Sequence, residues 1–366
     1  MGSAWLEKRP ALAASGIGVL GAICLLVFLE ALVRWLVPSI SFRDTDARLI
    51  LVRAFHGTHG NARGFTGQVF GVPTTTDSYG FRIDRTRSSL VETLGDRPTV
   101  LFLGDSVTFG VGVGDGKTFV DRVRANATRV HVMNASSIGY FLESYENVVR
   151  AFVVPNRQTL GIRKVVLGIC LNDLTTIREP VFEGPRNAQD GDALHATDDR
   201  NRAKQYNTLA VWFDEAFPAA NRYLRSRSKL FLLLKSLSVD SGRGHFLADT
   251  AAYRDAAAVD RSLGSLGRLA ADLRRANIDL DVLLFAYEYQ LRSDDSATHV
   301  PQRVLADFLA AQHVRHFDLI REFRRNMEAH GRRSADYYLF DDPMHLSELG
   351  HETVSRFILE NAIAGP

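Results

Sequence analysis

The chain passes from a short apolar run into a polar turn at VLFLGDSVTFG, residues Val100–Gly110. Four apolar residues followed by Gly104, Asp105 and Ser106 predict a buried β-strand that ends in a tight turn. Ser106 would then lie at the carboxyl edge of a sheet, next to the N-terminus of the following helix. Backbone N–H groups near such a terminus can stabilise an oxyanion. Because Gly-Asp-Ser also occurs in ordinary turns, this segment alone is a weak indication of a nucleophile.

Similar apolar runs recur along the rest of the chain and alternate with segments of helical periodicity. The runs expected to form buried strands are Thr99–Leu103, Val130–Met133, Lys164–Ile169, Leu280–Phe285 and His316–Leu319. The segments expected to form helices are Thr118–Ala127, Leu142–Phe152, Ala251–Arg275 and Gln302–Gln312. Strand–helix alternation is typical of a parallel sheet covered by helices on both faces. In such α/β sheets the reactive groups gather at the carboxyl ends of the strands.

A second segment with catalytic residue types lies near the C-terminus at DDPMHLSELGH, residues Asp341–His351. A serine hydroxyl is a poor nucleophile until a base removes its proton, and His345 could be that base. Asp342, three residues earlier, could hold the imidazole in one tautomer and offset its developing charge. This spacing favours Asp342 over Asp341, which is expected to be a loop or cap residue. Asp-x-x-His also occurs at capped helix starts, so this segment alone is a weak indication of a catalytic acid and base.

These two segments, with two more between them, resemble the four sequence blocks of the SGNH (GDSL-like) hydrolase family. The second block is VMNASSIG, residues Val132–Gly139, and the third is VVLGICLND, residues Val165–Asp173. The blocks occur in the family's order, each at the end of an expected strand. Four ordered blocks are far more specific than any one of them. The resemblance covers residues 98–360 apart from one insertion.

The resemblance implies both a fold and roles for the site residues. The fold would be a three-layer α/β/α sandwich of flavodoxin-like type with a five-stranded parallel sheet. Ser106 would be the nucleophile, His345 its base and Asp342 the acid of the triad. The oxyanion hole would consist of the backbone N–H groups of Ser106 and Gly139 and the side-chain amide of Asn172. No cofactor or metal ion is implied.

The third block departs from the family pattern at Cys170, which occupies the glycine position of Gly-x-Asn-Asp. Cysteine does not adopt positive φ values cheaply, so the local backbone could differ from that of the family. Asn172 and Asp173 are both present. Cys170 as a thiol nucleophile is the alternative, but no base accompanies it in the sequence. Cys24 lies in an apolar stretch, and both cysteines are expected to be free thiols.

An apolar stretch near the N-terminus predicts a membrane anchor. Ala11–Leu29 contains 19 residues without a charge, close to the ~20 that cross a bilayer. We expect an uncleaved single-pass anchor at residues 11–37, because the run is too long for a signal peptide and no clear cleavage site follows it. Basic residues flank it on both sides, so their distribution does not decide the orientation. By analogy with the family, the catalytic domain is expected outside the cytoplasm.

The anchor divides the chain into parts of different composition. We expect an N-terminal tail at residues 1–10, a juxtamembrane segment rich in Gly, Thr and Arg at 38–97, and the hydrolase domain at 98–366. An insertion at residues 179–238 interrupts that domain. It begins with the polar stretch Glu179–Lys204 and continues with Tyr206–Ser238, expected to form one or two amphipathic helices. The insertion is either an extra packing layer or a cap beside the active site.

Charge and histidine spacing argue against two other classes of protein. The formal net charge is +2, and no basic stripe with interleaved aromatic residues is present, so a nucleic-acid partner is not expected. The pairs His56/His59 and His313/His316 lack Cys, Asp or Glu neighbours at ligand spacing. We expect these histidines to face solvent rather than to bind a metal ion.

Taken together, the patterns predict a membrane-associated enzyme that forms an acyl-serine intermediate. The expected substrates are small-molecule or polysaccharide esters, with acyl or acetyl groups on a carbohydrate or a lipid. The alternative is an O-acyltransferase that uses the same triad to modify an extracellular polysaccharide. A third class, a binding module without activity, would be expected to have lost its nucleophile or base, and this chain keeps both.

Overall fold

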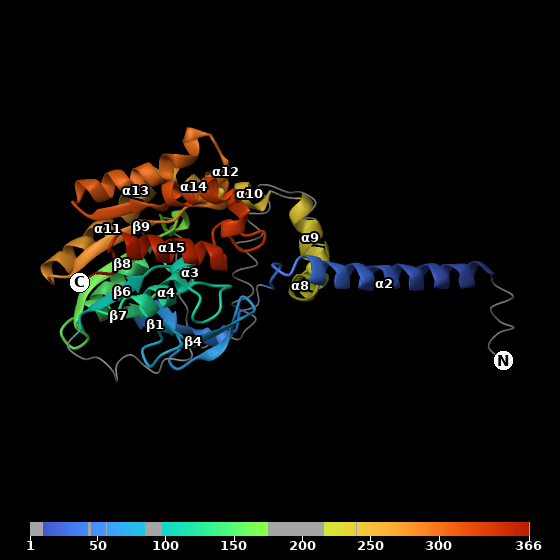
Figure 1. Cartoon of the computed structure of the whole chain (residues 1–366), viewed down its shortest axis with the longest axis horizontal. Helices are drawn as coiled ribbons and strands as arrows, with labels where there is room; N and C mark the ends of the chain where they lie inside the picture. The colour runs from blue at the N-terminus through green and yellow to red at the C-terminus, as the bar shows by residue number, and fades with distance from the viewer. Residues whose placement is uncertain are drawn as a thin grey trace.

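The computed structural model describes residues 10–42, 45–55, 57–84, 97–174, 216–238 and 240–365. Most of the predicted N-terminal tail, His56 and the polar stretch Glu179–Lys204 therefore lie outside the described residues. Within the described part, Figure 1 shows a layered α/β unit from which one long helix, α2 (Pro10–Leu36), extends.

The centre of the α/β unit is a five-stranded parallel sheet with the strand order β7–β6–β8–β9–β10. Its strands are β6 (Thr99–Leu103), β7 (His131–Asn134), β8 (Ile162–Ile169), β9 (Asp279–Leu284) and β10 (Arg315–Asp318). In chain order this is 2-1-3-4-5, the flavodoxin-like arrangement. Each strand lies within two residues of its predicted position. The predicted fold is confirmed.

Helices cover both faces of this sheet. They are α4 (Phe119–Asn126), α5 (Leu142–Val148), α11 (Ala256–Arg275), α13 (Val300–Ala311), α14 (Leu319–His330) and α15 (Glu348–Glu360). Right-handed crossovers place α4 on one face and α5, α11 and α13 on the other. Accordingly, α15 packs against α4, and α5 packs against α11. The predicted helix Leu142–Phe152 is found as α5 followed by a π-helical turn, Val149–Val153.

The central strands read as continuous apolar runs because both of their faces are covered. Every residue of β6 is buried, and so is every residue of β8 except Arg163. A strand with one face in water would instead alternate apolar and polar residues. Burial on both faces therefore explains why these strands could be predicted from the sequence.

Residues 45–84, expected to be a juxtamembrane segment, are folded onto the α/β unit. They form β1 (Ile50–Phe55), β2 (Thr58–Asn61), β3 (Thr66–Val69), β4 (Val72–Thr76) and β5 (Arg82–Ile83), in two small antiparallel sheets. Leu49, Phe65 and Val69 pack with Phe109 and Val111, which follow the predicted nucleophile. The composition of this segment gave no indication of these strands, and the domain boundary near residue 97 stays a prediction.

Arg82 joins the small sheets to the main unit. Its fully buried guanidinium donates to the carbonyl oxygens of Phe109 (2.8 Å), Gly110 (2.5 Å) and Val113 (2.5 Å). It also pairs with Asp115 at 3.3 Å. Burial lowers the pKa of Arg82, and the charges of Asp121 and Asp115 oppose that shift. These bonds hold the loop after Phe109 in place.

The described part of the insertion contains two helices, as expected for Tyr206–Ser238. They are α8 (Pro218–Arg227) and α9 (Lys229–Ser238), and α9 contacts α2 (Figure 1). Shorter helices follow at α10 (Ser241–Asp249) and α12 (Glu288–Arg292). By length and composition, the Gly18–Leu36 part of α2 could cross a membrane.

Candidate active site

Ser106 lies where β6 turns into the short helix α3 (Ser106–Phe109). The turn is tight because Gly104 packs directly on Thr108, and a Cβ atom at Gly104 would lie 2.2 Å from Thr108 Oγ1. Asp105 caps the helix, since its Oδ1 accepts from the Val107 N–H at 2.9 Å. The sequence therefore forms a strand–turn–helix unit that presents Ser106 at the carboxyl edge of the sheet.

Ser106, His345 and Asp342 form a continuous chain of hydrogen-bond contacts. Ser106 Oγ lies 2.8 Å from His345 Nε2. His345 Nδ1 lies 2.9 Å from Asp342 Oδ2 and 3.0 Å from Oδ1. Ser106 and Asp342 are buried, whereas the His345 side chain is 15% exposed. A buried carboxylate, an imidazole and a hydroxyl in this order can activate the hydroxyl as a nucleophile.

The loop before His345 distinguishes its two neighbouring aspartates. Asp342 Oδ1 accepts from the backbone N–H groups of Met344 (3.0 Å) and His345 (2.8 Å), which fixes the carboxylate beside the imidazole. Asp341 has a left-handed backbone, with φ +52°, and its Oδ1 accepts from Ser241 Oγ at 2.5 Å. The structure thus brings Asp342, and not Asp341, to His345.

The two other predicted oxyanion residues follow the strands on either side of β6. Gly139 is in the loop after β7, with φ +79°, and is solvent-exposed. Asn172 is in the 3₁₀ turn Leu171–Leu174 after β8. Carboxyl ends of neighbouring parallel strands meet at one edge of the sheet, which is where Ser106 lies. The role of these residues as oxyanion donors stays a prediction.

The turn that carries Asn172 is held by Asp173. Asp173 Oδ2 accepts from the Cys170 N–H and from Tyr145 Oη, both at 2.8 Å. Burial, together with the nearby charge of Asp105, raises the pKa of Asp173 well above its usual value. Cys170 is not among the described non-glycine residues with positive φ, so cysteine is accommodated here without that strain.

Cys170 is unsuited to be the nucleophile. Its side chain is completely buried. Burial is the main cause that raises the pKa of the Cys170 thiol well above its usual value, and the charges of Asp105 and Asp173 add to it. The reactive form of cysteine is the thiolate, which this environment disfavours.

Asp105, directly beside Ser106, is a buried acid with a raised pKa. Burial raises the pKa of Asp105 to about 6, although the Val107 N–H and the charge of His345 act in the opposite direction. Its carboxyl is therefore partly protonated in mildly acidic solution. Ser106 Oγ lies 3.5 Å from Asp105 Oδ2, a longer separation than that to His345 Nε2.

The small N-terminal sheets support the site at residues that the sequence did not single out. Phe70, at the β3–β4 turn, has its ring centroid 5.4 Å from that of His345, with the planes at 70°. Asn61 Nδ2 donates to the Ser136 carbonyl at 2.9 Å, and Ser137 Oγ donates to Asn61 Oδ1 at 2.8 Å. The loop that leads to Gly139 is thus held from outside the α/β unit.

The expectation that His59 faces solvent is wrong. Its side chain is buried, and Nε2 lies 2.7 Å from the carbonyl oxygen of Ile138. Tyr140 Oη donates to the His59 carbonyl at 2.8 Å, so β2 is tied to the Gly139 loop from both sides. Because β2 reads THGN, without apolar alternation, nothing in its pattern indicated this burial. His313, by contrast, is exposed.

His351 contacts α4 and is not part of the Ser106–His345–Asp342 contact chain. It is fully buried in the first turn of α15, where Nδ1 accepts from the Phe119 N–H at 3.1 Å. Burial and the charges of nearby arginines lower the pKa of His351 to about 3. The described residues contain no group of three or more His, Cys, Asp or Glu side chains arranged to hold a metal ion.

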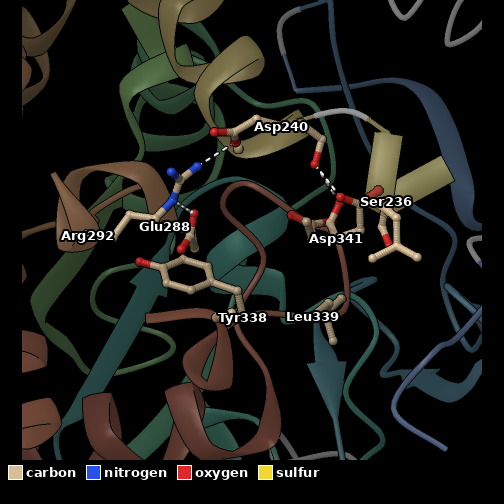
Figure 2. Close-up of a pocket in the computed structure, with 12 residues that line it drawn as sticks. Ser236, Asp240, Glu288, Arg292, Tyr338, Leu339 and Asp341 are labelled. Atoms are coloured by element: carbon tan, nitrogen blue, oxygen red, sulfur yellow. Dashed lines mark hydrogen bonds and ion pairs between the residues drawn. The ribbon is translucent and has the colours of Figure 1, made fainter. Parts of the chain in front are cut away.

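A polar cavity of about 470 Å³ borders the candidate triad at Asp342 (Figure 2). Arg292 pairs there with Asp240 at 2.5 Å and with Glu288 at 2.9 Å. The remaining lining residues are Ser236, Leu237, Ser241, Gly242, Ala335, Tyr338, Leu339 and Asp341. Eight of the twelve lining residues are polar, and the cavity has contributions from both α9 and the Asp341–Asp342 loop.

Several solved structures are similar to this chain. One is a member of the lipolytic G-D-S-L family from Veillonella parvula, 12% identical, with a TM-score of 0.38 over 72% of this chain and 96% of that one. Another is an acetylxylan esterase from Geobacillus stearothermophilus, 13% identical, with a TM-score of 0.40 over 73% of this chain and 94% of that one. No protein-family model matches the chain, and neither does any curated protein.

Proposed function

We propose that this chain is a serine ester hydrolase with Ser106 as nucleophile, His345 as general base and acid, and Asp342 as the residue that orients His345. The observation that carries the proposal is the unbroken contact chain from Ser106 Oγ to His345 Nε2 (2.8 Å) and from His345 Nδ1 to Asp342 (2.9 Å). Both contacts are within hydrogen-bond distance, although Ser106 and His345 are 239 positions apart in the sequence.

In the proposed reaction, Ser106 Oγ attacks the ester carbonyl carbon while His345 Nε2 takes the hydroxyl proton. The C–O bond to the alcohol then breaks, His345 returns the proton to the leaving oxygen, and an acyl-serine forms. Water attacks this intermediate with His345 again as base, and the acid is released. The Ser106 and Gly139 N–H groups and the Asn172 amide are proposed to bind the oxyanion.

The proposed substrates are acyl or acetyl esters of a carbohydrate or a lipid. A specific observation supports O-acyl transfer as the second candidate. The polar cavity beside Asp342 is lined by serine, tyrosine, carboxylate and guanidinium groups, which are suited to a polyhydroxylated acceptor. In that reaction a sugar hydroxyl, instead of water, takes the acyl group from Ser106.

The proposal is tested with the full chain in nanodiscs, using chromogenic acetyl and longer acyl esters and a fluorophosphonate that labels activated serines. Ser106→Ala should abolish both turnover and labelling, whereas the control Ser296→Ala, at an exposed serine that does not line the cavity, should keep both. Near-normal turnover by Ser106→Ala would exclude the proposed nucleophile. Products are then compared with and without a polysaccharide acceptor. Acylated polysaccharide in place of free acid would identify the transferase.

The oxyanion assignment has a separate test. Asn172→Ala should leave Ser106 able to react with the fluorophosphonate, but more slowly, because only one donor is removed. Loss of one such donor typically costs about 2.7–4 kcal/mol of transition-state stabilisation, roughly 10²–10³ in rate. An unchanged labelling rate would show that Asn172 does not contact the oxyanion.

A further inference from the structure

A carboxylate within the apolar helix α2 caps a helix of the insertion. Glu30 accepts from Ser228 Oγ at 2.8 Å and from the backbone N–H groups of Lys229 and Leu230, each at 2.9 Å. Arg34, one turn further along α2, pairs with Glu30 at 2.7 Å. The first N–H groups of a helix have no partners within that helix. The Glu30 carboxylate oxygens accept from these N–H groups at the start of α9, so α9 is held on α2 at Glu30.

The position of Glu30 along α2 matches the edge of a bilayer. The segment Pro10–Leu29 precedes it and contains 20 residues. At ~1.5 Å rise per residue this segment is about 30 Å long, the thickness of a bilayer's hydrocarbon core. If α2 spans the bilayer in this register, Glu30 and Arg34 lie at its surface, where charged groups are tolerated.

The hairpin formed by α8 and α9, residues 218–238, crosses α2 at that same level. Figure 1 shows α9 running across α2 rather than along it. A helix that crosses a membrane-spanning helix in this way lies in the plane of the bilayer surface. A second contact supports the placement, because Lys229 Nζ donates to the carbonyl oxygen of Pro38, just beyond the end of α2, at 3.1 Å.

The side chains of the hairpin suit a lipid surface. Residues 218–238 include five basic residues and no acidic residue. Large apolar side chains that are exposed on or next to the hairpin are Phe217 (49%), Tyr223 (64%), Leu234 (56%) and Leu237 (76%). Basic residues combined with exposed aromatic and aliphatic side chains are typical of helices that lie in the interface of anionic membranes.

We propose that the α8–α9 hairpin is a second membrane contact, which lies on an anionic bilayer surface and holds the α/β unit at a defined orientation. The proposal rests on α2 as a membrane anchor and not on the esterase activity. Leu237 also lines the cavity beside Asp342. The mouth of that cavity would therefore open close to the lipid surface.

The test uses the full chain in nanodiscs containing anionic lipid, with Cys24→Ser as background because Cys170 is buried. An environment-sensitive fluorophore is attached at Leu234→Cys and, as a second site, at Tyr223→Cys. The matched control is Leu359→Cys, another exposed leucine (37%), at the end of α15. The C-terminus, which follows α15, lies at the opposite end of the molecule from α2 (Figure 1). Lipids that carry a nitroxide near the headgroup quench any probe close to the membrane surface.

The expected result is blue-shifted emission and several-fold stronger quenching at both hairpin sites than at Leu359→Cys. Replacing the anionic lipid with a zwitterionic lipid should weaken the quenching at the hairpin. Quenching equal to that of the control at both sites would overturn the proposal. Blue-shifted emission without lipid quenching would also overturn it, because the surface would then be covered by a second protein chain. Neither readout depends on catalytic activity.

Discussion

Replacing Asp342 by asparagine tests the proposed triad at Asp342 Oδ2, the atom that faces His345 Nδ1 and sets the tautomer of His345. In the native chain the carboxylate can only accept, so His345 Nδ1 must carry the proton and Nε2 is free to accept from Ser106. In Asp342→Asn, the amide oxygen should remain at the Oδ1 position, because the Met344 and His345 N–H groups both donate there. The amide NH₂ then faces Nδ1 at about the present Oδ2 position, 2.9 Å away.

That arrangement changes the favoured tautomer of the His345 imidazole. A donor facing Nδ1 favours the tautomer protonated at Nε2, which cannot accept the Ser106 proton. The corresponding change in serine proteases lowers turnover by ~10⁴, or about 5 kcal/mol at 1.36 kcal/mol per factor of ten. Stability should change little, since both backbone N–H groups keep their acceptor. The matched control is Asp341→Asn, whose amide oxygen can still accept from Ser241, so its turnover should change by tenfold or less, about 1.4 kcal/mol.

The assay is turnover of a chromogenic ester by the full chain in nanodiscs, together with the rate of fluorophosphonate labelling of Ser106. Thermal midpoints of the two variants establish that both are folded. The reasoning is refuted if folded Asp342→Asn retains turnover within about tenfold of the native chain. It is also refuted if Asp341→Asn proves the more damaging of the two.

Four further perturbations have defined outcomes. Cys170→Ala should keep most of the ester turnover, because the buried thiol has a raised pKa and takes no part in the chemistry; loss of turnover in a folded variant would contradict this. Arg82→Met should lower the free energy of unfolding by about 3–5 kcal/mol, measured by urea denaturation, because Asp115 loses its buried partner. His351 should destabilise the fold as pH falls from about 6.5 toward 3, since its pKa is about 3 when folded; His351→Gln should weaken that pH dependence of the thermal midpoint. Glu30→Ala should increase amide exchange at the start of α9 without changing hydrolysis of a soluble ester.

The central sheet could be predicted because the sequence of each strand, taken alone, shows that it is buried. Strands such as β6 and β8 are buried on both faces and therefore appear as uninterrupted apolar runs. The 239 positions between Ser106 and His345 could be bridged only through the four-block resemblance, which supplies their order. Periodicity alone left the serine and the Asp-x-x-His segment as separate, weak signals.

The small N-terminal sheets could not be predicted because their order depends on distant partners. β2 and β4 contain Gly, Thr and Asn in place of alternating apolar residues. Arg82 would ordinarily be assigned to the surface. It is buried because three carbonyl groups between Phe109 and Val113 accept its N–H groups. No local pattern records such a pairing, and the same reason applies to His59 and Phe70.

Parts of the chain outside the four blocks contact the loop that carries Asp342 and His345. From the N-terminal side, Phe70 packs against His345. From the other side, Ser236 and Leu237 of α9 line the cavity that Asp341 and Asp342 border. The same fold carries many different activities, and the groups around a site select its substrate. We therefore infer that, under the proposed function, the blocks provide the ester chemistry, while Phe70 and the proposed membrane-contacting hairpin affect which ester reaches it.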